Sequence, residues 1–179
     1  MQMHNNIFDS THIHYSPSSK YSLGYRFEYI RNQSIFAHSM QLNNLLYRKN
    51  AQNYQANLYL KSGLGLIHDS NQIEPLLFSG LAADWETRRL FASYSNRFMW
   101  GGDVFNLINN SWRLGVAPYI GDYGDIHTWL MIQLDHNPIN AEEFVVTPLI
   151  KFFKSNYLLE IGYSLGKANN IFANFVWRF

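Results

Sequence analysis

The segment Tyr21–Ile30 reads YSLGYRFEYI and decides the fold, because its apolar and polar side chains alternate. One set of alternate positions carries only Tyr, Leu and Phe, and the other carries Ser22, Gly24, Arg26 and Glu28. Successive side chains of a β-strand point to opposite faces of a sheet. The segment therefore predicts a strand with one apolar face and one polar face.

The same alternation recurs along most of the chain. It is found in residues 54–63, 77–86, 89–100, 112–120, 127–135, 144–152, 159–166 and 171–179. Runs rich in Ser, Asn, Asp, Gly and Pro separate these segments, as is typical of turns. The segment 35–47 alternates poorly, although we still expect a strand there. About ten strands (roughly 8–12) joined as neighbours predict an all-β, up-and-down antiparallel barrel, since closure removes exposed sheet edges.

The composition excludes several classes of protein. The chain has 179 residues, enough for one domain, and its 14 Lys and Arg nearly balance its 13 Asp and Glu, so no basic field attracts nucleic acid. Cysteine is absent, which excludes disulfides, thiolate zinc sites and cysteine nucleophiles. No apolar run reaches the length of about 18 residues that a transmembrane helix needs.

Alternation alone does not say which face points inward. In a soluble lipocalin-like barrel the apolar face fills the centre, whereas in a membrane barrel it faces lipid. Glycines within the predicted strands share the charged face, and a crowded barrel interior suits glycine. Basic and acidic side chains on that face are nearly balanced, as a closed lumen requires. The predicted lumen charges are Arg26, Glu28, Lys61, Asp84, Glu86, Arg89, Arg97, Arg113, Asp135, Lys151, Glu160 and Arg178.

Tyrosine and tryptophan gather toward the ends of the apolar runs, where membrane barrels carry aromatic girdles. These residues are Tyr21, Tyr29, Tyr54, Trp85, Trp100, Trp112, Tyr157 and Trp177. We therefore predict a transmembrane barrel whose apolar face contacts lipid. A soluble lipocalin-like barrel that holds an apolar ligand is the alternative.

The end of the chain carries a family resemblance. Phe175-Val176-Trp177-Arg178-Phe179 has aromatic residues at alternate positions and finishes on phenylalanine. It resembles the C-terminal strand of bacterial outer-membrane β-barrel proteins, which the barrel-assembly machinery recognises. The resemblance implies location in a Gram-negative outer membrane, with outer-membrane lipid and that machinery as partners. It implies an assembly signal at Phe175, Trp177 and Phe179, but no particular activity or oligomeric state.

Such barrels begin and end on the periplasmic side, which requires an even number of strands. Counting back from Phe179, the tenth strand begins near Lys20. We therefore expect residues 1–19 to form a separate lumenal or periplasmic segment, and residues 20–179 to form the barrel.

The N-terminal segment carries candidate metal ligands. Met3, His4, His12 and His14 offer the thioether and imidazole groups that soft copper and silver ions prefer. His12 and His14 share one face of an extended segment. We therefore consider a copper or silver ion as ligand, and a role in envelope metal handling.

The other candidate functions are solute passage and lipid modification. About ten strands give a bore that side chains nearly fill, so we expect a largely plugged lumen with a narrow or gated path and a slight anion bias. A lipid-modifying acyl hydrolase or transferase would need a nucleophile and a base close together, and the candidates are Ser39 with His38, Ser95 with Asn96, and His127 with Asp135. The adjacent residues His38 and Ser39 point to opposite faces of a strand, so we predict no catalysis and no catalytic residues.

Overall fold

The computed structural model describes residues 1–5, 7–122, 124–138, 143–166 and 170–178. It contains strands and one short 3-10 helix, η1 (Arg31–Gln33). No described helix is long and apolar enough to cross a membrane. The strands are β1 (Gln2–His4), β2 (Phe8–Tyr15), β3 (Tyr21–Ile30), β4 (Ile35–Asn50), β5 (Gln55–His68), β6 (Ile73–Glu86), β7 (Leu90–Gly101), β8 (Phe105–Val116), β9 (His127–His136), β10 (Phe144–Lys154), β11 (Tyr157–Ser164) and β12 (Asn170–Trp177).

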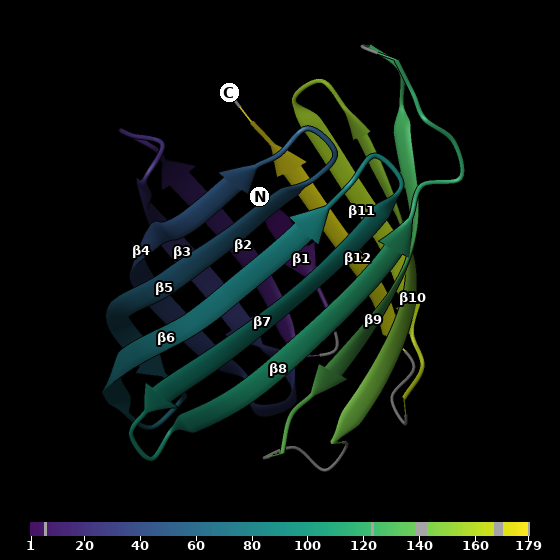
Figure 1. The fold of residues 1–179 in the computed structure, drawn as a ribbon. Coiled ribbons are helices and arrows are strands. Elements are labelled where there is room, and N and C mark those ends of the chain that lie inside the picture. Colours follow the sequence, from purple (N-terminus) through teal and green to yellow (C-terminus); the bar gives the residue numbers. More distant parts are fainter. Residues whose placement is uncertain (6, 123, 139–142, 167–169, 179) are drawn as a thin grey trace.

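The strands form one closed barrel in which each strand pairs with its neighbours in the chain (Figure 1). Every pairing is antiparallel, and β1 closes the barrel by pairing with β12, Gln2 opposite Phe175. The all-β, up-and-down antiparallel barrel predicted from alternation is confirmed. The described strands number twelve, at the upper end of the expected range.

The N-terminal residues account for the two additional strands. We expected residues 1–19 to lie apart from the barrel, but β1 and β2 are part of its wall. β2 pairs with β3 from Phe8 opposite Ile30 to Tyr15 opposite Leu23. The three residues of β1 complete the closure, so the even strand count holds with both termini counted in the wall.

The apolar face of the wall points outward and the charged face points inward. Tyr25, Leu81 and Ile161 are 42%, 46% and 49% exposed. Arg26 and Glu160, which lie on the other face, are only 8% and 3% exposed. This arrangement does not favour the soluble lipocalin-like alternative, in which the apolar face fills the interior.

The glycines of the inner face lie where the interior is crowded. A Cβ atom at Gly24 would lie 2.2 Å from His14 Nδ1, and one at Gly63 would lie 2.1 Å from the Phe78 ring. At Gly65 the nearest atom is the backbone oxygen of His38 on β4, at 1.8 Å. Side chains cannot replace these hydrogens without displacing neighbours, so the glycines allow the wall to curve closely around its contents.

Exposed aromatic side chains surround one rim of the barrel, which we call the C-terminal rim. The C-terminal rim carries the turns that follow β2, β4, β6, β8 and β10, together with the end of β12 (top of Figure 1). Exposed aromatic side chains gather on its outer face, among them Tyr15, Tyr21, Trp85, Tyr157 and Trp177. This is the arrangement that membrane barrels use at a lipid–water interface.

Toward the opposite rim, apolar side chains fill the inside of the barrel. We call this cluster the apolar plug; it comprises Phe8, Ile30, Ile35, Ala37, Ile67, Leu76, Phe78, Met99 and Leu107. Ile67 and Met99 are completely buried. Thr147 and Ser164, which bond to each other at 2.9 Å, are buried on the other side of the lumen. Apolar side chains and this hydroxyl pair thus occupy the interior toward the opposite rim.

Candidate functional site in the lumen

A charged group built on Glu28 joins two strands that are not neighbours in the wall. Arg26 and Glu28 lie two residues apart on β3, so both side chains enter the lumen, and Arg26 Nη2 donates to Glu28 Oε1 at 2.6 Å. Arg97 reaches across from β7 and donates to both carboxylate oxygens, at 2.8 and 2.5 Å. Glu28 is 1% exposed, so one buried carboxylate holds two guanidinium groups. This group carries a net positive charge.

A second charged group is built on Glu160. Arg113 on β8 donates from Nη1 to Glu160 Oε1 on β11 at 2.8 Å, and Asn174 on β12 donates to Oε2 at 2.9 Å. Arg113 also donates from Nε to Gln133 Oε1 at 3.0 Å. Gln133 in turn donates to Asp135 at 2.7 Å. Strands β8, β9, β11 and β12 are thereby linked through one hydrogen-bonded network.

The remaining charges of the predicted network are either partly buried inside the wall or exposed at a rim. Asp84 accepts from Asn57 Nδ2 at 2.7 Å, and Lys151 Nζ lies 5.3 Å from the centre of the Phe91 ring. Glu86 ends β6 and is half-buried. Arg89 and Arg178, which we expected in the lumen, are exposed at the C-terminal rim. Arg89 is in the turn before β7, and Arg178 follows the end of β12 with its guanidinium carbon 5.6 Å from the centre of the Phe153 ring.

A cavity of about 430 Å³ lies between these groups. Its charged lining consists of Arg26, Lys61, Arg97, Arg113 and a single carboxylate, Glu160. Lys61 forms no ion pair with any described residue. The cavity is therefore lined by an excess of positive charge.

Several buried polar atoms around the cavity have no hydrogen-bond partner among the described residues. They include Ser10 Oγ, His12 Nε2, Arg26 Nε and Arg97 Nε, and two amide oxygens, Gln41 Oε1 and Asn174 Oδ1. Buried polar groups are normally paired, so an unpaired group signals a water molecule or a ligand. The two arginine Nε atoms are obligatory donors, which an anion satisfies well.

Arg97 also connects the charged group to the apolar plug. Its guanidinium carbon lies 5.4 Å from the centre of the Phe8 ring and 5.5 Å from that of Phe78. Both rings belong to the plug. The positive group thus lies directly against the apolar barrier, as expected where a polar cavity meets a hydrophobic constriction.

The four expected metal ligands do not form one site. His12 and His14 face the lumen with ring centroids 6.0 Å apart, and Met3 lines the same cavity. His4 follows Met3 in an extended strand and therefore points to the other side of the wall. The described residues contain no group of three or more His, Asp or Glu side chains placed to hold a metal ion.

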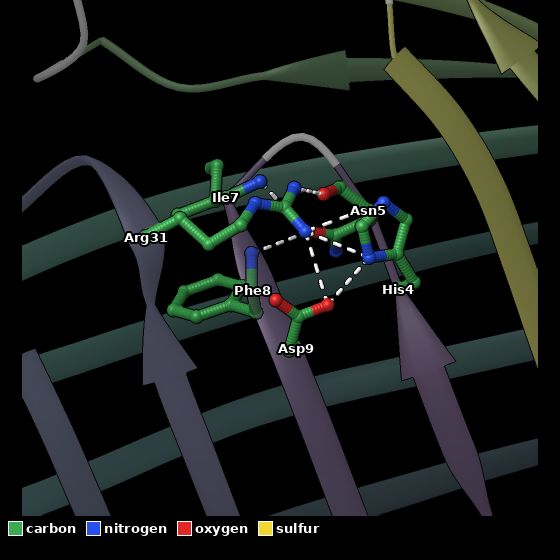
Figure 2. Close-up of polar contacts among 6 residues, drawn as sticks. All are labelled: His4, Asn5, Ile7, Phe8, Asp9 and Arg31. Atoms are coloured by element: carbon green, nitrogen blue, oxygen red, sulfur yellow. Dashed lines mark hydrogen bonds and ion pairs between the residues drawn. The ribbon is translucent and has the colours of Figure 1, made fainter. Parts of the chain in front are cut away.

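His4 instead belongs to a polar contact at the opposite rim (Figure 2). Its Nδ1 lies 2.5 Å from Asp9 Oδ1 and 2.7 Å from Arg31 Nη1, while Arg31 bonds to Asp9 at 3.0 Å. Asn5 Oδ1 accepts from the backbone N–H groups of Ile7 and Phe8 at 2.9 and 2.7 Å. These contacts fasten the turn between β1 and β2 to η1.

The residues considered for acyl transfer are also separated. Ser39 is buried in the lumen, whereas His38 lies on the outer face, where its Nδ1 is 2.6 Å from the Tyr25 hydroxyl. His127 and Asp135 share the inner face of β9 but stand eight positions apart, about 27 Å along a strand. None of these pairs forms a nucleophile–base contact in the described structure.

Uncharged residues that the sequence did not point to complete the lumen network. Asn57, Gln133 and Asn174 each bridge a charged group to its neighbours. In the sequence these three residues are marked only by their position on the charged face of a strand. Serine and threonine residues occupy the same face, so this position does not distinguish them. Of the three residues expected to form an assembly signal, Phe175 and Trp177 lie on the outer face, and Phe179 falls outside the described residues.

Comparisons with known proteins identify the architecture. No protein-family model matches the chain. No curated protein sequence matches it either. Among solved structures, the chain is similar to a KdgM porin in complex with disordered oligogalacturonate, with a TM-score of 0.61 and 11% sequence identity. The match covers 96% of this chain and 92% of the porin. At this identity the likeness extends to the fold alone, a closed antiparallel β-barrel.

Proposed function

We propose that this chain is a barrel of the Gram-negative outer membrane that admits small anionic solutes along a gated path. The observation that carries the proposal is the basic lining of the lumen cavity, with its unpaired arginine Nε donors. The outward apolar face, the aromatic rim and the resemblance of the last strand support the membrane location. In this proposal Phe175, Trp177 and Phe179 are read by the barrel-assembly machinery.

The structural neighbour supports the solute class. The KdgM porin is in complex with oligogalacturonate, an oligomer of a sugar acid, and therefore an anion at neutral pH. A lumen that carries four basic side chains and one carboxylate around its cavity suits the same charge. We propose sugar acids and their short oligomers as the solutes to test first.

The apolar plug acts as the gate in this proposal. Hydrophobic constrictions exclude water and ions until the lining side chains separate. The described structure is then the closed state, with Arg97 positioned between the cavity and the plug. We expect low conductance at rest.

Conductance across planar lipid bilayers tests the proposal. We expect small, anion-selective conductance that galacturonate reduces in a concentration-dependent way, and neutral sugars at equal concentration should leave it unchanged. The double substitution Leu76→Ala and Met99→Ala removes two buried side chains of the plug and should raise the conductance several-fold. Leu77→Ala, at the exposed neighbouring position, is the matched control.

Charge substitution then tests selectivity. Lys61→Gln removes a lumen cation that holds no described ion pair, so we expect weaker anion selectivity without loss of folding. Lys154→Gln changes the same residue type at the exposed end of β10 and should leave selectivity unchanged. Equal reversal potentials for the parent chain and Lys61→Gln would argue against the basic lumen as the selective element.

A further inference from the structure

Two asparagine side chains interrupt the apolar outer face at the middle of the wall. Asn96 on β7 and Asn110 on β8 are directly paired across the two strands. Along each strand the neighbouring outward side chains are apolar or aromatic: Tyr94 and Phe98 flank Asn96, and Ile108 and Trp112 flank Asn110. The pair therefore lies within the proposed lipid-facing band and not at either rim.

The hydrogen bonds of this pair leave one amide nitrogen and one amide oxygen without a partner among the described residues. Asn96 Nδ2 donates to Asn110 Oδ1 at 3.2 Å, and the Tyr94 hydroxyl donates to the same oxygen at 3.0 Å. Asn110 Nδ2 and Asn96 Oδ1 have no partner among the described residues. An amide donor and an amide acceptor are thus left facing outward, where acyl chains offer no hydrogen bonds.

The ladder between β6 and β7 is interrupted beside Asn96. The pairing of β6 with β7 runs from Leu77 opposite Trp100 to Ser79 opposite Phe98 and resumes at Ala82 opposite Ser95. Gly80, Leu81, Asn96 and Arg97 fall in the interruption, where the wall also borders the lumen cavity. Because unpaired polar groups in hydrocarbon are expensive, their concentration at one place on the outer wall indicates a contact surface.

We propose that this surface, formed by Ser79, Leu81, Tyr94, Asn96 and Asn110, joins two copies of the chain side by side in the membrane. The proposal rests on the membrane location proposed above. Asn96 and Asn110 occupy one rung of the wall, so a two-fold axis along the membrane normal brings each next to the other in the second copy. Asn110 Nδ2 of each copy then donates to Asn96 Oδ1 of the other.

A second copy fits better than other occupants because the surface is self-complementary. It offers a free amide donor group and a free amide oxygen in neighbouring positions, so each of these two groups finds a partner in the second copy. Lipid headgroups lie at the rims, away from the middle of the wall. Polar side chains that bond across segments are a common means of association within membranes.

Energy transfer between labelled copies in lipid vesicles tests the proposal. Donor- and acceptor-labelled full-length chains are mixed, and the protein-to-lipid ratio is lowered until transfer disappears. For the double substitution Asn96→Val and Asn110→Val we expect transfer to disappear at about tenfold higher protein density than for the parent. Asn44→Val, which removes an asparagine from the outer face of β4, is the control and should behave as the parent.

Cysteine cross-linking gives an independent readout, because the chain contains no cysteine. Chains carrying Asn96→Cys mixed with chains carrying Asn110→Cys should form disulfide-linked dimers on mild oxidation. Chains carrying Leu159→Cys on β11 should remain monomeric.

Flotation with the vesicles tests the membrane location separately from the contact surface between two copies. A chain that floats but shows no transfer at any density, or the same transfer in the double variant, overturns the contact surface alone. A chain that does not float overturns the membrane location, and the contact surface with it.

Discussion

At the scale of single residues, the stability of the lumen depends on its buried carboxylates, and Glu28 is shared by two arginines. Glu28 receives hydrogen bonds from two arginines that come from β3 and β7, strands that are not neighbours in the wall. Removing one member of a buried ionic group leaves an uncompensated charge, which destabilises more than the group itself stabilises. The carboxylates are therefore the sensitive positions.

Replacement of Glu28 tests this view. Glu28→Gln leaves Arg26 and Arg97 facing each other without an anion, so we expect the free energy of unfolding to fall by about 3–5 kcal/mol. Urea unfolding in lipid vesicles, followed by the fast-migrating folded band on unboiled gels, measures the change. Asp103→Asn, in the exposed turn between β7 and β8, should have no effect. Equal midpoints for Glu28→Gln and Asp103→Asn would show that the ionic group does not stabilise the barrel.

In the exposed turn between β5 and β6 we expect a contribution to stability that depends on pH. The backbone N–H groups of Asn71 and Gln72 donate to Asp69 Oδ1 at 2.7 and 2.9 Å and lower the pKa of this carboxyl. Since the pKa in the folded state is lowered, the stabilisation is present above the ordinary carboxyl pKa. It is lost as the pH falls through the lowered value.

Nuclear magnetic resonance in micelles measures this titration. The amide shifts of Asn71 and Gln72 should titrate below the ordinary Asp value of about 3.9, and Asp69→Asn should abolish the transition. A midpoint at or above the ordinary value would contradict the turn geometry.

At the scale of the element, close strand packing at glycine positions shapes the wall. The nearest atoms to a Cβ at Gly65 are backbone atoms of β4, His38 O at 1.8 Å and Ser39 Cα at 2.7 Å. We therefore expect Gly65→Ala to part β4 from β5 locally and to lower the folded fraction recovered from urea. Gly121→Ala, which meets only side-chain atoms at 3.3 Å or more, is the control. Equal recovery of both variants would contradict the close approach.

Alternation predicted most strands because most inner faces are polar and most outer faces apolar. The alternation is weak in the first half of β4, because the apolar plug places apolar residues on the inner face there: Ile35 and Ala37 point inward. A register shift between Leu45 and Tyr47 blurs the pattern further along β4. β1 has three residues, too few to show a period. The plug and the two added strands therefore emerge only from the three-dimensional structure.

At the scale of the whole molecule, the lumen has a polar part and an apolar part in series. The sequence predicted the charged face and most residues of its network. It did not predict which charges meet, since Arg97 and Glu28 lie 69 residues apart in the chain. Nor did alternation reveal the plug, because inward apolar residues look like outward ones in a single strand.

The membrane location requires that the apolar face of the wall meets lipid, and nitroxide accessibility along β8 in lipid vesicles tests this most directly. Single substitutions to cysteine at Ile108 and Leu114 place labels on the outer face, while those at Asn109 and Ser111 place them beside the lumen cavity. We predict high collision rates with oxygen, which concentrates in lipid, for the two outer labels and low rates for the two inner labels. High oxygen collision rates at Asn109 and Ser111, with water-soluble nickel reagent reaching Ile108 and Leu114, would contradict the account.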